Sequence, residues 1–126
     1  MVEVHYRDRL GNNLFQYCLG RIIAEELGFA LKAGPLEGFP HTAAEVSGKC
    51  HSAPEQVLEG QRINLQEVLA NRTARKILLN GWFQRHEYYT AQRERIRQWL
   101  VMDPVHDTPC RNADLVVNVR RTDYIG

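Results

Sequence analysis

The opening of the chain has the order and spacing of a strand, a helix and a second strand. Residues 2–6 alternate apolar and polar side chains, as a half-buried strand does, and residues 29–33 form another short apolar run. Between them, apolar side chains recur every three or four positions over residues 15–27. This predicts a helix begun by an asparagine cap at residue 12 or 13 and ended by Gly28. About 30 residues suffice for a parallel βαβ unit with a right-handed crossover, so the opening favours an α/β fold.

The rest of the chain continues to alternate helix and strand patterns. Asn64 and Glu67 have the spacing of a capping box, which predicts a short helix over residues 64–71. Residues 76–79 predict a strand that ends at the breaker Asn80-Gly81, and Thr90 is placed to cap a helix that extends to residue 100. Residues 114–119 are almost continuously apolar, as in a strand buried on both faces. We therefore expect an α/β fold with a Rossmann-like layered sheet.

Two further features of the pattern concern surfaces. Residues 34–60 contain scattered proline and glycine without a period, which predicts a long irregular surface segment. Such a segment is either a ligand-specific surface or a simple excursion between elements. On the predicted helix over residues 90–100, Ile96, Trp99 and Leu100 are expected to turn inward, and Arg95 is expected to lie in solvent.

Composition limits the class of protein. The chain has 126 residues, 44% of them hydrophobic, and a net charge of +1, as expected for one soluble globular domain without general affinity for nucleic acid. It has no apolar signal region and no run of about 18 apolar residues, which predicts a cytoplasmic protein without a membrane span. Cys18, Cys50 and Cys110 show no metal-binding spacing, and Cys18 is expected in the core.

The last residues carry a cluster of charged side chains. The predicted strand over residues 114–119 delivers Arg120, Arg121 and Asp123 to its C-terminal end, where open α/β sheets bind their ligands. A pair of arginines there suits a diphosphate, because a guanidinium neutralises the charge that develops on the leaving group. The alternative is a surface cluster of ion pairs that covers a strand end. A chain that stops soon after this strand predicts a domain that is incomplete at its C-terminal end.

Two other segments leave alternatives open. The loop around Gly11 is either an anion site at a helix N-terminus or a tight turn between strand and helix. His86 and Glu87 are candidates for an acid and base pair or for contacts with a sugar hydroxyl. The aromatic residues beside them either stack on a sugar or form a corner of the core. They are Trp82, Phe83, Tyr88 and Tyr89.

Taken in order, three segments resemble one family of enzymes. Leu10-Gly11-Asn12-Asn13-Leu14-Phe15-Gln16-Tyr17 resembles the GLGNQLFQYA opening of the alpha-1,2-fucosyltransferases, family 11 of the glycosyltransferases. Gly81-Trp82-Phe83-Gln84, followed by Tyr88 and Tyr89, is similar to the family's GYFQ segment. Asn118-Val119-Arg120-Arg121-Thr122-Asp123-Tyr124 resembles its HxRRxDY motif. The three matches span nearly the whole chain.

This resemblance implies a fold and an activity. The family is similar to the B class of glycosyltransferases (GT-B), in which two Rossmann-like domains face a cleft. It transfers fucose from GDP-fucose to a galactoside hydroxyl with inversion and without a metal. Residues 1–126 would then form the N-terminal domain, truncated before a C-terminal donor-binding domain, so the isolated chain is expected to lack turnover. The alternative is a non-catalytic remnant that binds a sugar or a partner.

The resemblance also implies roles for single residues. Arg120 and Asp123 would be catalytic, and Arg120, Arg121, Asn12 and Tyr124 would bind the donor, with no metal or other cofactor. The partners would be GDP-fucose and a galactoside-containing glycan, and contact with the inner face of the membrane would be peripheral. Where the family has histidine, this chain has Asn118, whose amide is no general base near neutral pH.

Overall fold

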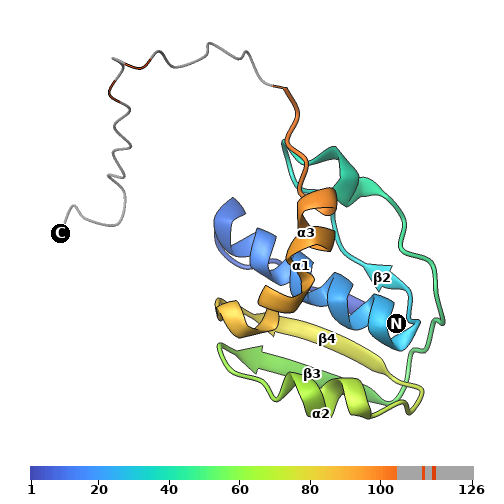
Figure 1. The fold of residues 1–126 in the computed structure, drawn as a ribbon. Coiled ribbons are helices and arrows are strands. Elements are labelled where there is room, and N and C mark those ends of the chain that lie inside the picture. The colour runs from blue at the N-terminus through green and yellow to red at the C-terminus, as the bar shows by residue number, and fades with distance from the viewer. Residues whose placement is uncertain (105–111, 113–114, 116–126) are drawn as a thin grey trace.

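The computed structural model describes residues 1–104, 112 and 115, and these residues form an α/β fold around a parallel sheet (Figure 1). The strands are β1 (Val2–Val4), β2 (Leu31–Lys32), β3 (Glu55–Gly60) and β4 (Lys76–Gly81). The α-helices are α1 (Leu10–Leu27), α2 (Leu65–Ala70) and α3 (Arg93–Trp99). Three short 3-10 helices complete the described part: η1 (Pro40–Ala43), η2 (His86–Tyr88) and η3 (Thr90–Gln92). The predicted α/β class is confirmed.

The sheet consists of two units of strand, helix and strand, β1-α1-β2 and β3-α2-β4. The two units are joined by the pairing of β1 with β4. Its order in the described residues is β2-β1-β4-β3, and every neighbouring pair is parallel, in agreement with a Rossmann-like layout. In this register Val4 lies opposite Leu79, and Gly60 lies opposite Gly81. The C-terminal ends of β1, β3 and β4 therefore meet at one edge of the sheet, which is where parallel sheets place their ligands.

Helix α1 is buried on two sides because it lies between the sheet and α3. One side contributes Leu19 and Ile23 to a core shared with the strands, and the other contributes Tyr17 and Ile22 to a second core that includes Trp99. Close contact with the sheet requires glycine at position 20, since a Cβ there would lie 2.4 Å from a methyl carbon of Val4. The helix ends at Gly28 with a left-handed φ of 66°, as predicted.

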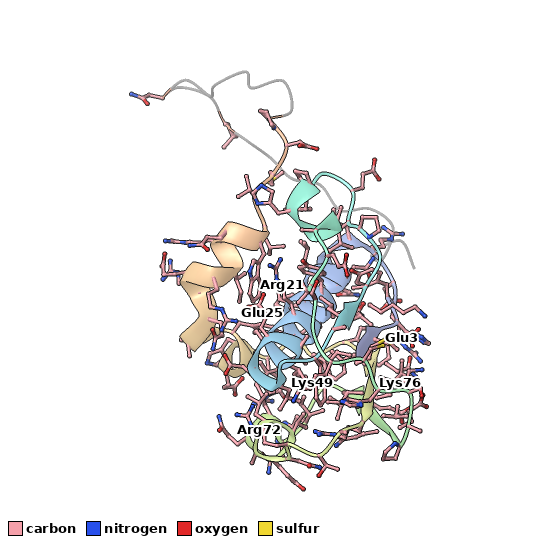
Figure 2. The ribbon with its side chains drawn as sticks, turned by 90° about the vertical axis from the view of Figure 1, so that its right-hand side faces the viewer. Glu3, Arg21, Glu25, Lys49, Arg72 and Lys76 are labelled. Carbon is pink, nitrogen blue, oxygen red and sulfur yellow. The ribbon has the colours of Figure 1, made fainter. Side chains whose placement is uncertain are left out.

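Helix α3 is attached to α1 by charged and aromatic contacts, which involve Arg21 and Glu25 of α1 (Figure 2). Arg95 donates to Glu25 and, at 2.9 Å, to Glu26, while Arg21 donates to Glu25 at 2.7 Å. The guanidinium carbons of Arg21 and Arg95 lie 4.6 and 5.4 Å from the centre of the Trp99 ring. The prediction that Arg95 lies in solvent holds only in part: its side chain is 36% exposed, because it pairs with the acidic residues of α1 and lies over Trp99.

Several predicted boundaries are also wrong. Strand β3 lies inside the stretch predicted to be irregular, and Asn80-Gly81 continues β4 instead of ending it. Helix α1 begins at Leu10 after Arg9, without a hydrogen bond from a capping side chain, so Asn12 and Asn13 lie inside its first turn instead of capping it. The final helix is α only from Arg93, since residues 90–92 form a 3-10 turn.

The predicted strand over residues 114–119 lies outside the described residues except at one position. That position is Leu115, which is in no strand and is 88% exposed. No described element covers its side chain, so the expectation of a buried strand fails at this residue.

The side of the sheet away from α1 carries an ion-pair cluster on the central strand. Val2 and Val4 face α1, so Glu3 between them points to the opposite side, where Figure 2 also shows Lys76. Glu3 is 13% exposed and accepts hydrogen bonds from Lys32 at 2.8 Å and Lys76 at 2.9 Å. These two hydrogen bonds lower the pKa of the Glu3 carboxyl to about 2.

We expect Glu3→Gln to lower the free energy of unfolding at pH 7 by about 2 kcal/mol, after allowance for solvent around Lys32. The folded-state pKa of Glu3 lies below its unfolded value, so its stabilisation is complete above the unfolded pKa of 4.5 and disappears as pH falls towards about 2. Urea unfolding across this range should therefore show the parent and variant converging in acid. If the parent and Glu3→Gln differed in free energy of unfolding by the same amount at every pH, this explanation would be contradicted. Glu59→Gln, at an exposed position of the edge strand β3, is the control.

Candidate functional site

A group of polar side chains lies where the loops after β1 and β4 meet. We call it the sheet-edge network and define it as Arg7, Asp8, Asn12, Trp82 and Gln84. Asp8 accepts hydrogen bonds from the indole nitrogen of Trp82 and, at 3.2 Å, from the amide nitrogen of Asn12. Gln84 in turn donates to the amide oxygen of Asn12. The network thus joins two parts of the chain that are 72 to 74 residues apart.

The backbone adopts unusual conformations in the loop after β1 and in the loop after β4. Asp8 has a φ of 62° and Phe83 has a φ of 54°, and these are the non-glycine residues with positive φ in the described part of the chain. Left-handed backbone is uncommon for such residues and is often found at binding sites, where the surrounding fold holds it. Phe83 is held by complete burial in the core, and Asp8 by its contacts with Trp82 and Asn12.

The loop after β1 is held in place by hydrogen bonds between its main chain and a buried glutamine. Gln16 is fully buried, accepts from the main-chain nitrogen of Arg7 at 3.0 Å and donates to its carbonyl oxygen at 3.4 Å. This fixes the backbone of Arg7, whose exposed side chain donates to Asn80 at 2.8 Å. The Arg7 guanidinium also lies 5.6 Å from the centre of the Trp82 ring. The edge therefore presents a cation, a carboxylate, amides and an indole together.

The end of β3 joins the same edge. The main-chain nitrogen of Gln84 donates to the side chain of Gln61 at 3.0 Å, one residue after β3 ends. The residue after Asn12 is a separate feature of this edge: the buried side-chain oxygen of Asn13 has no hydrogen-bond partner among the residues that the structure describes. Three strand ends therefore contribute to one polar surface.

His86 and Glu87 lie in an exposed ion-pair group rather than in an enclosed acid and base pair. Glu87 lies 3.5 Å from the His86 ring and 2.6 Å from the Arg85 guanidinium, and the His86 side chain is 86% exposed. A backbone hydrogen bond and the Arg85 guanidinium lower the pKa of the Glu87 carboxyl. A solvent-exposed carboxylate with a lowered pKa is a weak base, so this pair is a poor candidate for proton transfer.

The aromatic run divides between the core and the sheet edge. Phe83 is fully buried, and the Tyr89 hydroxyl lies 2.6 Å from the Phe83 carbonyl oxygen. Burial raises the pKa of Tyr89. Tyr88 packs beside Tyr89 in the same corner, while the indole of Trp82 joins the sheet-edge network. The core-corner interpretation is therefore right for three of the four aromatic residues, whereas Trp82 belongs to the candidate site.

Among the predicted site residues, Asn12 is placed in the sheet-edge network. Arg120, Arg121, Asp123 and Tyr124 lie outside the described residues, so their approach to this edge stays a prediction. The sequence analysis missed Asp8, Arg7 and Gln61 as members of the site. Arg7 and Asp8 have one sequence signal, their position directly after the predicted strand over residues 2–6, whereas Gln61 follows β3, which was not predicted.

Other classes of site were considered over the same residues. In the part of the chain that the structure describes, no three His, Cys, Asp or Glu side chains come together as ligands for a metal. None of the described helices combines the length and the apolar character needed to cross a membrane. Compared with known proteins, the chain matches no family model, no curated protein and no solved structure.

Proposed function

We propose that this chain acts in fucosyl transfer from GDP-fucose to a galactoside hydroxyl, with inversion, as the Rossmann-like N-terminal domain of a GT-B glycosyltransferase. The observation that carries the proposal is the pair of contacts Asp8 to Trp82 and Asn12 to Gln84. The second contact joins two of the three segments on which the resemblance to the alpha-1,2-fucosyltransferases rests, and the first joins the residue two positions before the opening segment to the middle one. Both lie at the edge of a parallel sheet where ligands commonly bind.

The sheet-edge network has the chemistry that sugar recognition needs. Hydroxyl groups are bound by carboxylate and amide side chains, and the apolar face of a sugar ring packs on an indole. Asp8, Asn12 and Trp82 supply these three groups within one hydrogen-bonded cluster. We assign Asp8 and Trp82 to the galactoside, with Asp8 orienting the acceptor hydroxyl because it is the network's carboxylate. Asn12 beside them is assigned to the donor, as the resemblance implies.

The donor would be bound by the C-terminal motif. Cleavage of the bond between fucose and the β-phosphate leaves negative charge on GDP, and a guanidinium held at the diphosphate stabilises that charge. We assign this role to Arg120, with Arg121 assisting and Tyr124 contacting the donor. Asp123 is assigned as the second catalytic residue, and together with Tyr124 it orders the motif. The chemistry needs no metal when arginine supplies the positive charge.

Arg120→Ala should weaken binding of GDP-fucose about 10- to 100-fold, since a charge-assisted hydrogen bond is worth about 1.5–3 kcal/mol. Isothermal titration of the 126-residue chain with GDP-fucose measures this effect, and Arg111→Ala is the matched control. Equal affinity of the parent and Arg120→Ala would exclude the assigned role.

A transfer assay with lactose separates the catalytic proposal from simple binding. Turnover that disappears in Arg120→Ala would support fucosyl transfer by the chain itself. Lactose binding that is weakened by Trp82→Ala, without transfer, would favour the sugar-binding alternative. Failure to bind either GDP-fucose or lactose would remove the proposed function.

A further inference from the structure

An open groove of about 840 Å³ lies between α1 and α3, beside the sheet edge but distinct from its polar network. Its floor is apolar and comes from both helices. The floor residues are Leu14, Phe15, Cys18, Ile96 and Leu100. This volume falls in the range of small-molecule sites in proteins.

Two polar groups near the floor, the Tyr89 hydroxyl and the Cys18 thiol, leave its apolar character unchanged. Tyr89 forms one wall with its ring packed 5.5 Å from that of Phe15, while its hydroxyl points to main-chain oxygens of Phe83 and Phe15, at 2.6 and 3.2 Å. Burial raises the pKa of the Cys18 thiol to about 12, so this side chain packs as an apolar group. Phe15 nevertheless remains 39% exposed, which leaves apolar surface available to a ligand.

The rim of the groove is positively charged. Arg93 and Arg97 lie one helical turn apart on α3 and both line the groove, and no aspartate or glutamate is among the described residues that do. Arg97 has an exposed partner in Glu94 at 3.2 Å, whereas Arg93 has no carboxylate partner among the residues described. An apolar floor with two guanidinium groups at its rim, of which only that of Arg97 has a carboxylate partner among the described residues, complements a ligand that is apolar along its body and anionic at one end.

The dimensions favour a small ligand over a peptide helix. Helix α3 has seven residues, a length of about 10 Å. A docked amphipathic helix uses anchors up to seven residues apart, a span of about 10 Å that would take the whole length of this wall and leave none for the ends of the peptide. We infer that the groove binds a small anionic amphiphile, with its apolar chain on the α1 and α3 floor and its carboxylate or phosphate at Arg93 and Arg97. This inference does not depend on the proposed function.

The test is an NMR titration of the whole chain with octyl phosphate, octanoate and 1-octanol, each below the concentration at which it forms micelles. The anions should shift the amide signals of α1 and α3 and bind at least about tenfold more tightly than the alcohol. A stronger response to either head group supports the proposal and identifies carboxylate or phosphate as the preferred end. Equal affinity for the alcohol and both anions, or the absence of binding, would overturn it.

Two variants locate the ligand. The double variant Arg93→Gln, Arg97→Gln should bring the anions to the affinity of the alcohol, with Arg72→Gln on another part of the surface as control. Gly11→Leu should block binding of all three probes, because Gly11 lines the groove and a Cβ there meets no atom within 4 Å. Circular dichroism checks that each variant is folded. If Gly11→Leu does not fold, the double variant Arg93→Gln, Arg97→Gln decides the outcome. Retention of anion preference in the double variant would contradict the assigned head-group position.

Discussion

Replacing Arg75 by leucine should lower the free energy of unfolding by about 3–5 kcal/mol. Arg75 is 3% exposed, and its guanidinium donates to main-chain carbonyls of Asn71 at 2.7 Å, Thr73 at 2.9 Å and Val68 at 3.0 Å. It also donates to the Gln56 side chain at 2.7 Å. Leucine fills part of the volume but leaves the buried Val68 carbonyl without this donor, at about 1–3 kcal/mol, and removes three part-buried hydrogen bonds that each contribute less.

Urea unfolding monitored by circular dichroism checks this expectation, with Arg72→Leu as the matched control. Arg72 is three residues away, exposed, and contacts a single carbonyl, that of Glu26, at 2.5 Å. Its replacement should cost well under half as much as that of Arg75. Equal losses in the two variants would show that the hydrogen bonds of Arg75 are not what stabilises the end of α2 and its connection to β4.

Gly81→Ala should destabilise the protein by about 3 kcal/mol, at the upper end of the usual cost of overpacking. A Cβ at this position would lie 2.4 Å from the oxygen and 2.6 Å from the nitrogen of Gly60, its partner on β3. Both atoms belong to the backbone and cannot turn aside as a flexible side chain does. The strands would have to separate, and the Gly60 carbonyl would lose its hydrogen bond of 3.0 Å from the nitrogen of Trp82.

Thermal and urea unfolding measure this loss, and Gly11→Ala is its control. A Cβ at Gly11 meets no atom within 4 Å, and alanine is a better helix former than glycine by about 1 kcal/mol. The two identical substitutions should therefore act in opposite directions. If Gly81→Ala proved as stable as the parent, the two strands would not be held as closely as the structure shows. Because Trp82 follows Gly81, the same variant should also weaken the proposed binding of lactose at the sheet edge.

The order of most elements could be predicted because their signals are local. The Asn64 side chain accepts from the main-chain nitrogen of Glu67 at 3.2 Å, as the capping spacing predicts. Gly28 ends α1, and Cys18 is buried within it. Strand β3 was missed because it lies at the edge of the sheet, where half-exposed residues such as Glu55 and Glu59 weaken the apolar pattern.

Asn80-Gly81 shows how tertiary contacts override a local preference. The pair is typical of a turn, yet both residues extend β4 opposite the end of β3. Glycine is needed there because the Gly60 backbone approaches closely, and not because the chain reverses. A pattern read along the chain cannot distinguish these two uses of glycine, since the approaching strand is about 20 residues away.

The sequence by itself determined the α/β class, the opening strand and helix, and the two segments that later meet at the sheet edge. Helix periods and caps depend on residues up to four positions apart, so they can be recognised in the sequence. Only the tertiary structure decided that Asp8 bonds Trp82 and that Asn12 bonds Gln84. Those contacts follow from the parallel pairing of β1 with β4, which places Val4 opposite Leu79 and so brings the two following loops together. The α1–α3 groove arises in the same way, because burial of Trp99 beneath Arg21 and Arg95 sets where α3 lies on α1.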